Sequence, residues 1–135
     1  YIVAALAQYE SGARSHPTMR GYGILLSEQD GADLAAYFNG ATPPLASAGP
    51  NGTLPEQAAI CVTCHGRNGA GTQKDYPRLS GQHADYLARS LNDYRLGKRN
   101  NPIMQPFAQQ LTPDDIRALA EYFSNQKGLE TPDLD

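Results

Sequence analysis

Cys61-Val62-Thr63-Cys64-His65 is the stretch that decides how this sequence folds and what it binds. Two residues separate its thiols, so both would lie on one helical turn, and an imidazole follows the second thiol directly. This order suits two thioether bonds to a porphyrin, with the histidine as a ligand of the porphyrin iron. We therefore predict one covalently attached haem c, held by Cys61, Cys64 and His65.

Three other interpretations of the two cysteines are weaker. A zinc site would need further cysteine or histidine ligands, but His16 and His83 each stand alone in the sequence. A thioredoxin-like redox site would need a preceding strand and a βαβ context, which the sequence does not indicate. A structural disulfide is disfavoured because cysteines so close together on a helix have poor disulfide geometry.

The two methionines are the candidates for the sixth iron ligand. Met104 is the stronger one, because Pro102 and Pro106 on either side of it reduce the entropy lost when the sulfur is held. Met19 lies in the similar stretch Pro17-Thr18-Met19. We predict Met104 as the distal ligand of this haem, and Met19 as a ligand only if a first haem is present.

Other residues are expected around the haem. A metal-ligating histidine needs an acceptor for its second ring nitrogen. The carbonyl of Pro77, twelve residues after His65, is predicted to accept that hydrogen bond. Leu79 is predicted to line the porphyrin, although an ordinary core position explains it equally well. The same two interpretations apply to Ile103, Phe107 and Leu119.

An internal repeat organises the chain. Residues 1–39 placed over 86–124 give thirteen identical positions without a gap. Each copy reads as a helix ending at glycine, a loop with Pro-x-Met and a helix ending in Tyr-Phe. Only the second copy is preceded by the cysteine motif. We therefore expect the chain to be the C-terminal part of a longer two-unit protein.

The fold class predicted is all-α, with short helices and no alternating strand pattern. Helices are expected over 55–65, from an N-cap at Ser80 to Leu96, and from an N-cap at Thr112 to about Gly128. Four domain segments are predicted: 1–39, the end of a first repeat; 40–52, a Gly/Pro linker; 53–128, a complete haem domain; and 129–135, a tail.

Composition excludes some classes of function. The chain has 11 Lys and Arg against 14 Asp and Glu, a formal charge of −3, which argues against nucleic acid as a partner. No stretch of about eighteen apolar residues indicates a transmembrane helix. The basic group Arg89, Arg95, Lys98 and Arg99 could guide docking to an acidic partner, or be a solvated helix face.

These residues together resemble the class I cytochromes c. The stretch 76–87, followed by Gly97-Lys98-Arg99 and Pro102-Ile103-Met104, looks like the second domain of two-haem periplasmic cytochromes of the c-four type. The resemblance implies the class I fold and a periplasmic location, with a second haem in the full-length protein. It also implies Cys61 and Cys64 as thioether attachments, His65 as proximal ligand, Met104 as distal ligand and Pro77 as hydrogen-bond acceptor.

The function expected is electron transfer rather than catalysis. An iron with two protein ligands and no nearby general acid or base suits the relay of single electrons between redox proteins of a respiratory chain. No small-molecule substrate is expected, and membrane association only through partners. Two alternatives stay open: a haem subunit of an oxidoreductase, such as one oxidising sulfur compounds, and a gas sensor in which Met104 dissociates.

Overall fold

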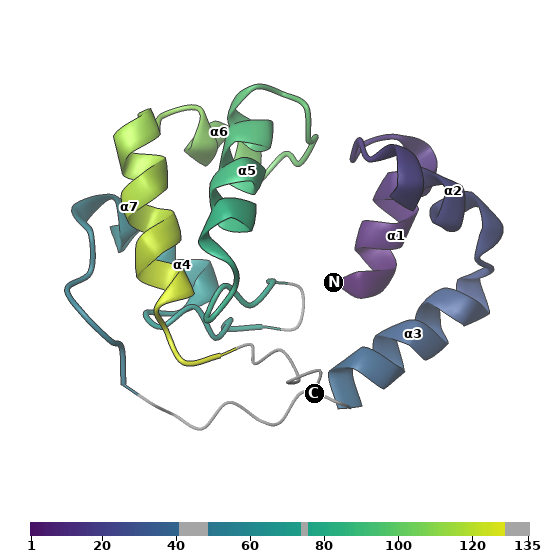
Figure 1. The fold of residues 1–135 in the computed structure, drawn as a ribbon, viewed down its shortest axis with the longest axis horizontal. Coiled ribbons are helices and arrows are strands. Elements are labelled where there is room, and N and C mark those ends of the chain that lie inside the picture. Colours follow the sequence, from purple (N-terminus) through teal and green to yellow (C-terminus); the bar gives the residue numbers. More distant parts are fainter. Residues whose placement is uncertain (41–48, 74–75, 129–135) are drawn as a thin grey trace. The chain divides into compact units, whose positions relative to one another are not determined.

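The computed structural model describes residues 1–40, 49–73 and 76–128 (Figure 1). Its helices are α1 (Ile2–Ser11), α2 (Pro17–Leu25), α3 (Glu28–Gly40), the 3₁₀ helix η1 (Glu56–Ala59), α4 (Val62–His65), α5 (Ala84–Arg95), α6 (Met104–Ala108) and α7 (Pro113–Ser124). Within these ranges the only extended pairing is one isolated antiparallel bridge, so the predicted all-α class is confirmed. Most of the predicted linker, 41–48, and the predicted tail, 129–135, lie outside the described residues.

The chain divides into two compact units. The described part of the first contains 1–40 and 93–110, and that of the second contains 49–73, 76–92 and 111–128. The chain therefore leaves the second unit within α5 and returns to it just before α7.

In the first unit, α1 packs on α2 and α3 through small contact residues. A Cβ atom at Gly23 of α2 would lie 2.9 Å from the backbone nitrogen of Glu10, so only glycine permits this approach. The end of α1 follows the prediction, because Gly12 adopts a left-handed conformation with φ of 80°. An antiparallel bridge between Arg14 and Arg99 ties α1's end to residues 93–110.

Loops were predicted for both Pro-x-Met segments; residues 17–19 are helical, whereas Pro102 and Ile103 form a turn and only Met104 is helical in the second segment. Pro17 and Met19 lie in the first turn of α2, and Met104 is the first residue of α6, which also contains Pro106. Proline is tolerated there because the first amide groups of a helix have no partner within the helix. Pro17 therefore starts α2 in place of the predicted loop, and Pro106 lies in the first turn of α6.

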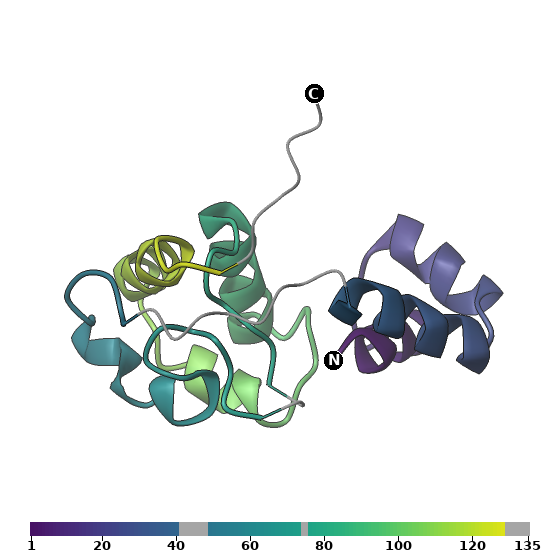
Figure 2. The same ribbon diagram turned by 90° about the horizontal axis from the view of Figure 1, so that it is seen from below.

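The second unit is built on α7, whose N-terminus is capped as predicted. The Thr112 hydroxyl accepts the Asp115 N–H, and the Asp115 carboxylate accepts the Thr112 N–H at 2.8 Å. The buried residues of α7 are Ile116, Leu119, Ala120, Tyr122 and Phe123. All but Ile116 belong to a core cluster that also contains the buried Ala58 and Leu87. Helix α7 runs beside residues 84–92 of α5 (Figures 1 and 2).

Two predicted helices differ from the structure. The helix expected over 55–65 is split into η1 and α4, with a turn at Ile60 and Cys61 between them. The N-cap predicted at Ser80 is wrong, because Gly81 adopts φ of 68° and α5 starts only at Ala84. Ser80 is instead fully buried, and its N–H donates to the carbonyl of Gly69.

Candidate haem site

The cysteine motif is held by helix α4. Cys61 is its N-cap, and its carbonyl accepts the His65 N–H at 3.0 Å. Both cysteines are free and half-buried, and Cys61 packs against the core of the second unit. Burial raises the pKa of the Cys61 thiol, and the neighbouring Cys64 adds to this shift, so the protonated thiol is favoured.

The imidazole of His65 is buried, with 5% of its surface exposed, and its orientation is set by one hydrogen bond. Its Nδ1 lies 3.0 Å from the carbonyl oxygen of Pro77. A carbonyl can only accept, so Nδ1 carries the proton and Nε2 keeps the lone pair that can ligate a metal. Burial lowers the pKa of His65, although the bond to Pro77 opposes this, so the neutral ring is favoured.

A short loop after α4 fixes the carbonyl groups of the motif. Gly66 ends the helix with φ of 79°, and the chain then folds back on itself. The Thr72 hydroxyl donates to the carbonyl of Cys64 at 2.7 Å, and the Gly71 N–H donates to the carbonyl of His65 at 2.7 Å. These bonds hold the motif from its C-terminal side.

Helix α7 supports the same loop from the core. The Tyr122 hydroxyl donates to the carbonyl of Arg67 at 2.8 Å. The backbone of Gly69 lies so close to Phe123 that a Cβ atom there would be 2.8 Å from its ring. Thr72, Gly69 and Tyr122 were not predicted as site residues; the one signal in the sequence was the repeated Tyr-Phe pair.

Leu79 joins the second unit's cluster. Its side chain packs against the core, and its N–H donates to the carbonyl of Gly69 at 2.7 Å. Leu119 is buried in the core of the same unit, which is one of the two interpretations given for it from the sequence. Cys61, Cys64, His65, Pro77 and Leu79 thus belong to one unit.

Met104 and Met19 lie in the first unit, as do the exposed side chains of Ile103 and Phe107. The backbone N–H of each methionine donates a hydrogen bond to the side chain three residues before it. The Met104 N–H donates to Oδ1 of Asn101 at 2.9 Å, and the Met19 N–H donates to Nδ1 of His16 at 3.3 Å. Asn101 and His16 occupy equivalent positions of the repeat, and each side chain accepts a hydrogen bond from the N–H of the methionine three residues later.

The donor set of the second unit fits haem c. It provides two free thiols in the attachment spacing and a neutral imidazole with a defined lone pair. No group of three or more His, Cys, Asp or Glu side chains that could hold a metal ion occurs among the described residues. No helix in the described ranges is long and apolar enough to cross a membrane.

Comparison with known proteins identifies the family of the chain. The sequence model of the family described as Cytochrome c matches residues 56–127. A cytochrome c4 from Azotobacter vinelandii is 40% identical over 129 residues, which is 84% of this chain and 61% of the relative. A thiosulfate dehydrogenase electron acceptor from Stutzerimonas stutzeri is 33% identical over 148 residues, 97% of this chain and 68% of the relative.

Solved structures give the same answer for the fold. The structure of Acidithiobacillus ferrooxidans cytochrome c4 matches with a TM-score of 0.76 and 27% identity, over 92% of this chain and 82% of the other. The fold is therefore that of class I cytochromes c, whose members carry covalently bound haem c, and Cys61 and Cys64 fit that attachment. The chain belongs to the cytochrome c family, and its relatives include proteins named cytochrome c4.

Proposed function

We propose that this chain is an electron-transfer haem protein and not an enzyme. The observation that carries the proposal is the buried His65, whose Nδ1–H is held by the Pro77 carbonyl directly beside the two free thiols. Such a ligand has one orientation and one tautomer, so it need not rearrange when the iron changes charge. Little reorganisation suits the transfer of electrons.

The residues have separate roles in this proposal. When bound, haem c supplies an iron that gains and loses one electron. Cys61 and Cys64 attach the porphyrin, His65 is the proximal ligand, Leu79 lines the ring and Met104 is the distal ligand. Ligation by His and Met favours the reduced state and raises the reduction potential.

Carbon monoxide tests this function against the sensor alternative. In an electron carrier both axial positions are filled by protein ligands, so the reduced protein should bind carbon monoxide slowly and weakly. Optical titration of the reduced full chain measures this, together with a potentiometric titration that should follow a one-electron curve. Rapid carbon monoxide binding by the unmodified protein would contradict the proposal.

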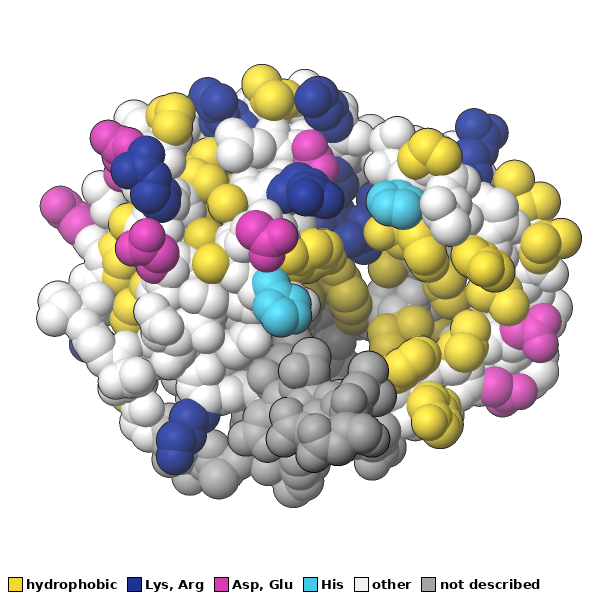
Figure 3. All heavy atoms as spheres, in the orientation of Figure 1, with side chains coloured by type: hydrophobic (Ala, Val, Ile, Leu, Met, Phe, Trp, Pro, Cys, Tyr) yellow, Lys and Arg dark blue, Asp and Glu magenta, His cyan; other side chains and the backbone are white. Residues whose placement is uncertain are grey.

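The internal repeat supports the proposed domain organisation. Tyr37 and Phe38 are 70% and 54% exposed, whereas their counterparts Tyr122 and Phe123 are 7% and 4% exposed. Apolar side chains gather on the surface of α1, α2 and α3 (Figure 3). In the second unit the loop after the cysteine motif covers this pair, so we infer that 1–39 is the corresponding part of a first repeat, joined by 40–52 to the haem domain 53–128.

The whole protein is proposed to carry two haems, with Met19 as a ligand of the first. The chain spans 61% of the Azotobacter relative, so this concerns the longer protein. We place that protein in the periplasm, passing electrons between redox proteins of a respiratory chain, such as a membrane cytochrome complex and a terminal oxidase or reductase. A pyridine haemochrome assay with an intact mass counts the haems; one haem in the longer protein would contradict the assignment of Met19.

A second candidate function is a haem subunit of an oxidoreductase that oxidises sulfur compounds. Its support is the 33% identity to the thiosulfate dehydrogenase electron acceptor of Stutzerimonas stutzeri. In that case thiosulfate should reduce the haem only when a thiosulfate-oxidising enzyme is added. Reduction by thiosulfate alone would contradict both candidate functions.

A further inference from the structure

Tyr76 places its aromatic ring against the imidazole of His65. The centroids of the two rings lie 6.3 Å apart and the ring planes meet at 60°, which is an edge contact. Aromatic rings attract one another at centroid separations of about 4.5–7 Å, so this contact is favourable. Both residues belong to the second unit, so the contact lies within one compact body.

The backbone that carries the Tyr76 ring is held at several points. Its N–H donates to the carbonyl of Gln73 at 3.2 Å. Pro77 follows directly, and a proline restricts the residue before it to an extended backbone. The backbone of Gly71 lies so close that a Cβ atom there would be 3.2 Å from the Tyr76 carbonyl oxygen. The ring therefore projects from a rigid stretch of chain.

Tyr76 does not have the role of an ordinary core residue. It is half-buried, whereas His65 is 5% exposed. As far as the chain is described, Tyr76 belongs neither to the buried cluster of the second unit nor to the partly buried side chains packed against that cluster. Its contact with His65 therefore indicates a role at the haem site rather than in the core.

The hydrogen bond of His65 leaves a second contact something to do. The bond from Nδ1 to the Pro77 carbonyl sets the orientation of the imidazole only to within the angular range that such bonds tolerate, which is about 30° from linear. The torsion about the Cβ–Cγ bond of a histidine has broad minima, so it does not fix the ring plane either. A second ring against the imidazole narrows this range.

We propose that Tyr76 is a positioning residue, whose ring fixes the plane of the His65 imidazole. The proposal deepens the electron-transfer function and rests on it, because it takes His65 as the proximal ligand of haem c. The direction of an axial imidazole plane decides how the unpaired electron of ferric iron is distributed over the porphyrin. A plane that stays the same in both oxidation states keeps reorganisation small.

The test compares proton NMR spectra of the oxidised full chain carrying haem c. Tyr76→Leu removes the aromatic ring, whereas Tyr76→Phe keeps the ring and removes only the hydroxyl. The chemical shifts of the haem methyl groups report the direction of the imidazole plane. Tyr76→Leu should therefore change the spread of these shifts, and Tyr76→Phe should keep the pattern of the unmodified protein. The reduction potential of Tyr76→Leu should also rise, because a freer imidazole weakens its bond to Pro77.

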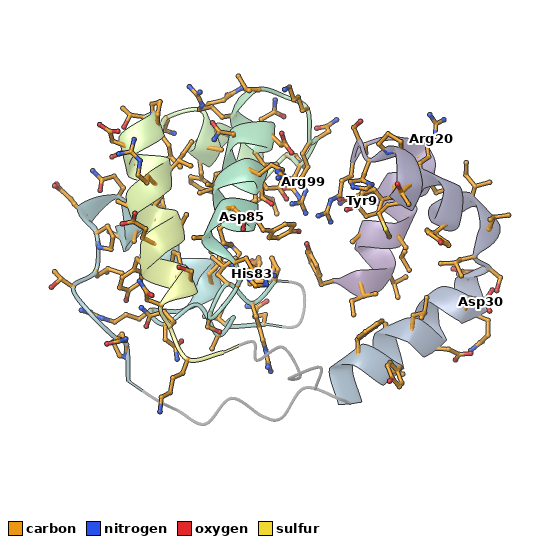
Figure 4. The ribbon with its side chains drawn as sticks, viewed as in Figure 1. Tyr9, Arg20, Asp30, His83, Asp85 and Arg99 are labelled. Atoms are coloured by element: carbon orange, nitrogen blue, oxygen red, sulfur yellow. The ribbon has the colours of Figure 1, made fainter. Side chains whose placement is uncertain are left out.

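The matched control is Tyr9→Leu. Tyr9, in α1 (Figure 4), makes an edge contact with a different histidine, His16, with ring centroids 6.3 Å apart and planes at 73°. Tyr9 is half-buried like Tyr76 but belongs to the first unit, so Tyr9→Leu should leave the methyl shifts and the potential unchanged. An unchanged pattern in Tyr76→Leu, or an equal change in Tyr76→Phe or Tyr9→Leu, would overturn the proposal.

Haem content and circular dichroism establish that each variant is folded. If Tyr76→Leu does not fold, the reduced unmodified protein provides the test, because its ring protons of Tyr76 and His65 should show a nuclear Overhauser effect. Absence of that effect would overturn the proposal. Carbon monoxide binding by the unmodified protein tests the electron-transfer function separately: rapid binding would contradict that function, while the methyl shifts of Tyr76→Leu would still decide the role of Tyr76.

Discussion

Gln126 and Asn51, 75 positions apart, are joined by two hydrogen bonds. The side-chain amide of Gln126 pairs with both backbone groups of Asn51, as a neighbouring strand would. The Asn51 N–H donates to Oε1 of Gln126 at 2.8 Å, and Nε2 of Gln126 donates to the Asn51 carbonyl at 2.7 Å. Nε2 also donates to the carbonyl of Tyr122 at 2.8 Å. The buried Gln126 thereby fastens the start of the second unit to the end of α7.

We expect Gln126→Leu to lower the free energy of unfolding by about 1–3 kcal/mol, because it leaves backbone groups without partners. Urea unfolding followed by circular dichroism measures this. The control is Gln109→Leu, at an exposed position, which should change stability by less than about 0.5 kcal/mol. Equal effects of both substitutions would show that the Asn51 bonds do not contribute.

Gly69→Ala should destabilise the chain more than Gly52→Ala. Both glycines have positive φ, 75° and 80°, a conformation that costs other residues about 1–2 kcal/mol. Only at Gly69 would the new Cβ meet neighbours, with Phe123 and the Ser80 nitrogen at 2.8 Å. Overpacking adds about 1–3 kcal/mol, giving about 2–5 kcal/mol in urea unfolding. Indistinguishable urea midpoints for Gly69→Ala and Gly52→Ala would show that Gly69 does not pack closely against Phe123 and Ser80.

Thr112→Ala should lower the urea midpoint at neutral pH, and this effect should fade in acid. The hydrogen bonds from Thr112 lower the pKa of Asp115 below its ordinary 3.8. A lowered folded-state pKa stabilises the fold above pH 3.8 and the stabilisation is lost as the pH falls below that value. The exposed Thr53→Ala serves as control; a Thr112→Ala effect independent of pH would contradict this account.

Pro77→Ala should raise the reduction potential of the haem. The Pro77 carbonyl accepts the Nδ1 proton of His65 at 3.0 Å, which makes the imidazole a more basic ligand and stabilises the oxidised iron. A less rigid turn weakens this bond. Potentiometry should detect the rise, and Pro113→Ala at the start of α7 should leave the potential unchanged. A fall in the reduction potential would show that the hydrogen bond from His65 to Pro77 does not stabilise the oxidised iron.

Met104→Ala should leave the haem covalently attached but remove the weak sulfur-to-iron band near the red edge of the ferric spectrum. Attachment depends on Cys61 and Cys64, whereas the band depends on the distal ligand. The matched control is Met19→Ala, which should keep the band in this chain. Survival of the band in Met104→Ala would disprove Met104 as the ligand.

Several features could be predicted from the sequence because short-range geometry determines them. The cysteine motif is one helical turn, so its spacing alone indicates haem c attachment. The cap at Thr112 and the end of α1 at Gly12 depend on neighbours within four residues. The thirteen identities between 1–39 and 86–124 showed that one unit occurs twice.

Other features were decided only by the tertiary structure. Ser80 has the residue type of an N-cap, but packing buries it and α5 begins four residues later. Arg99 looks like a surface cation in a basic segment, but it is buried on Tyr94. The support of the haem motif by Tyr122 and the bonds of Gln126 to Asn51 join residues 55 and 75 positions apart. Sequence spacing carries no information about such contacts, because they depend on how separate helices pack, and packing is decided by the burial of the whole core rather than by any local pattern.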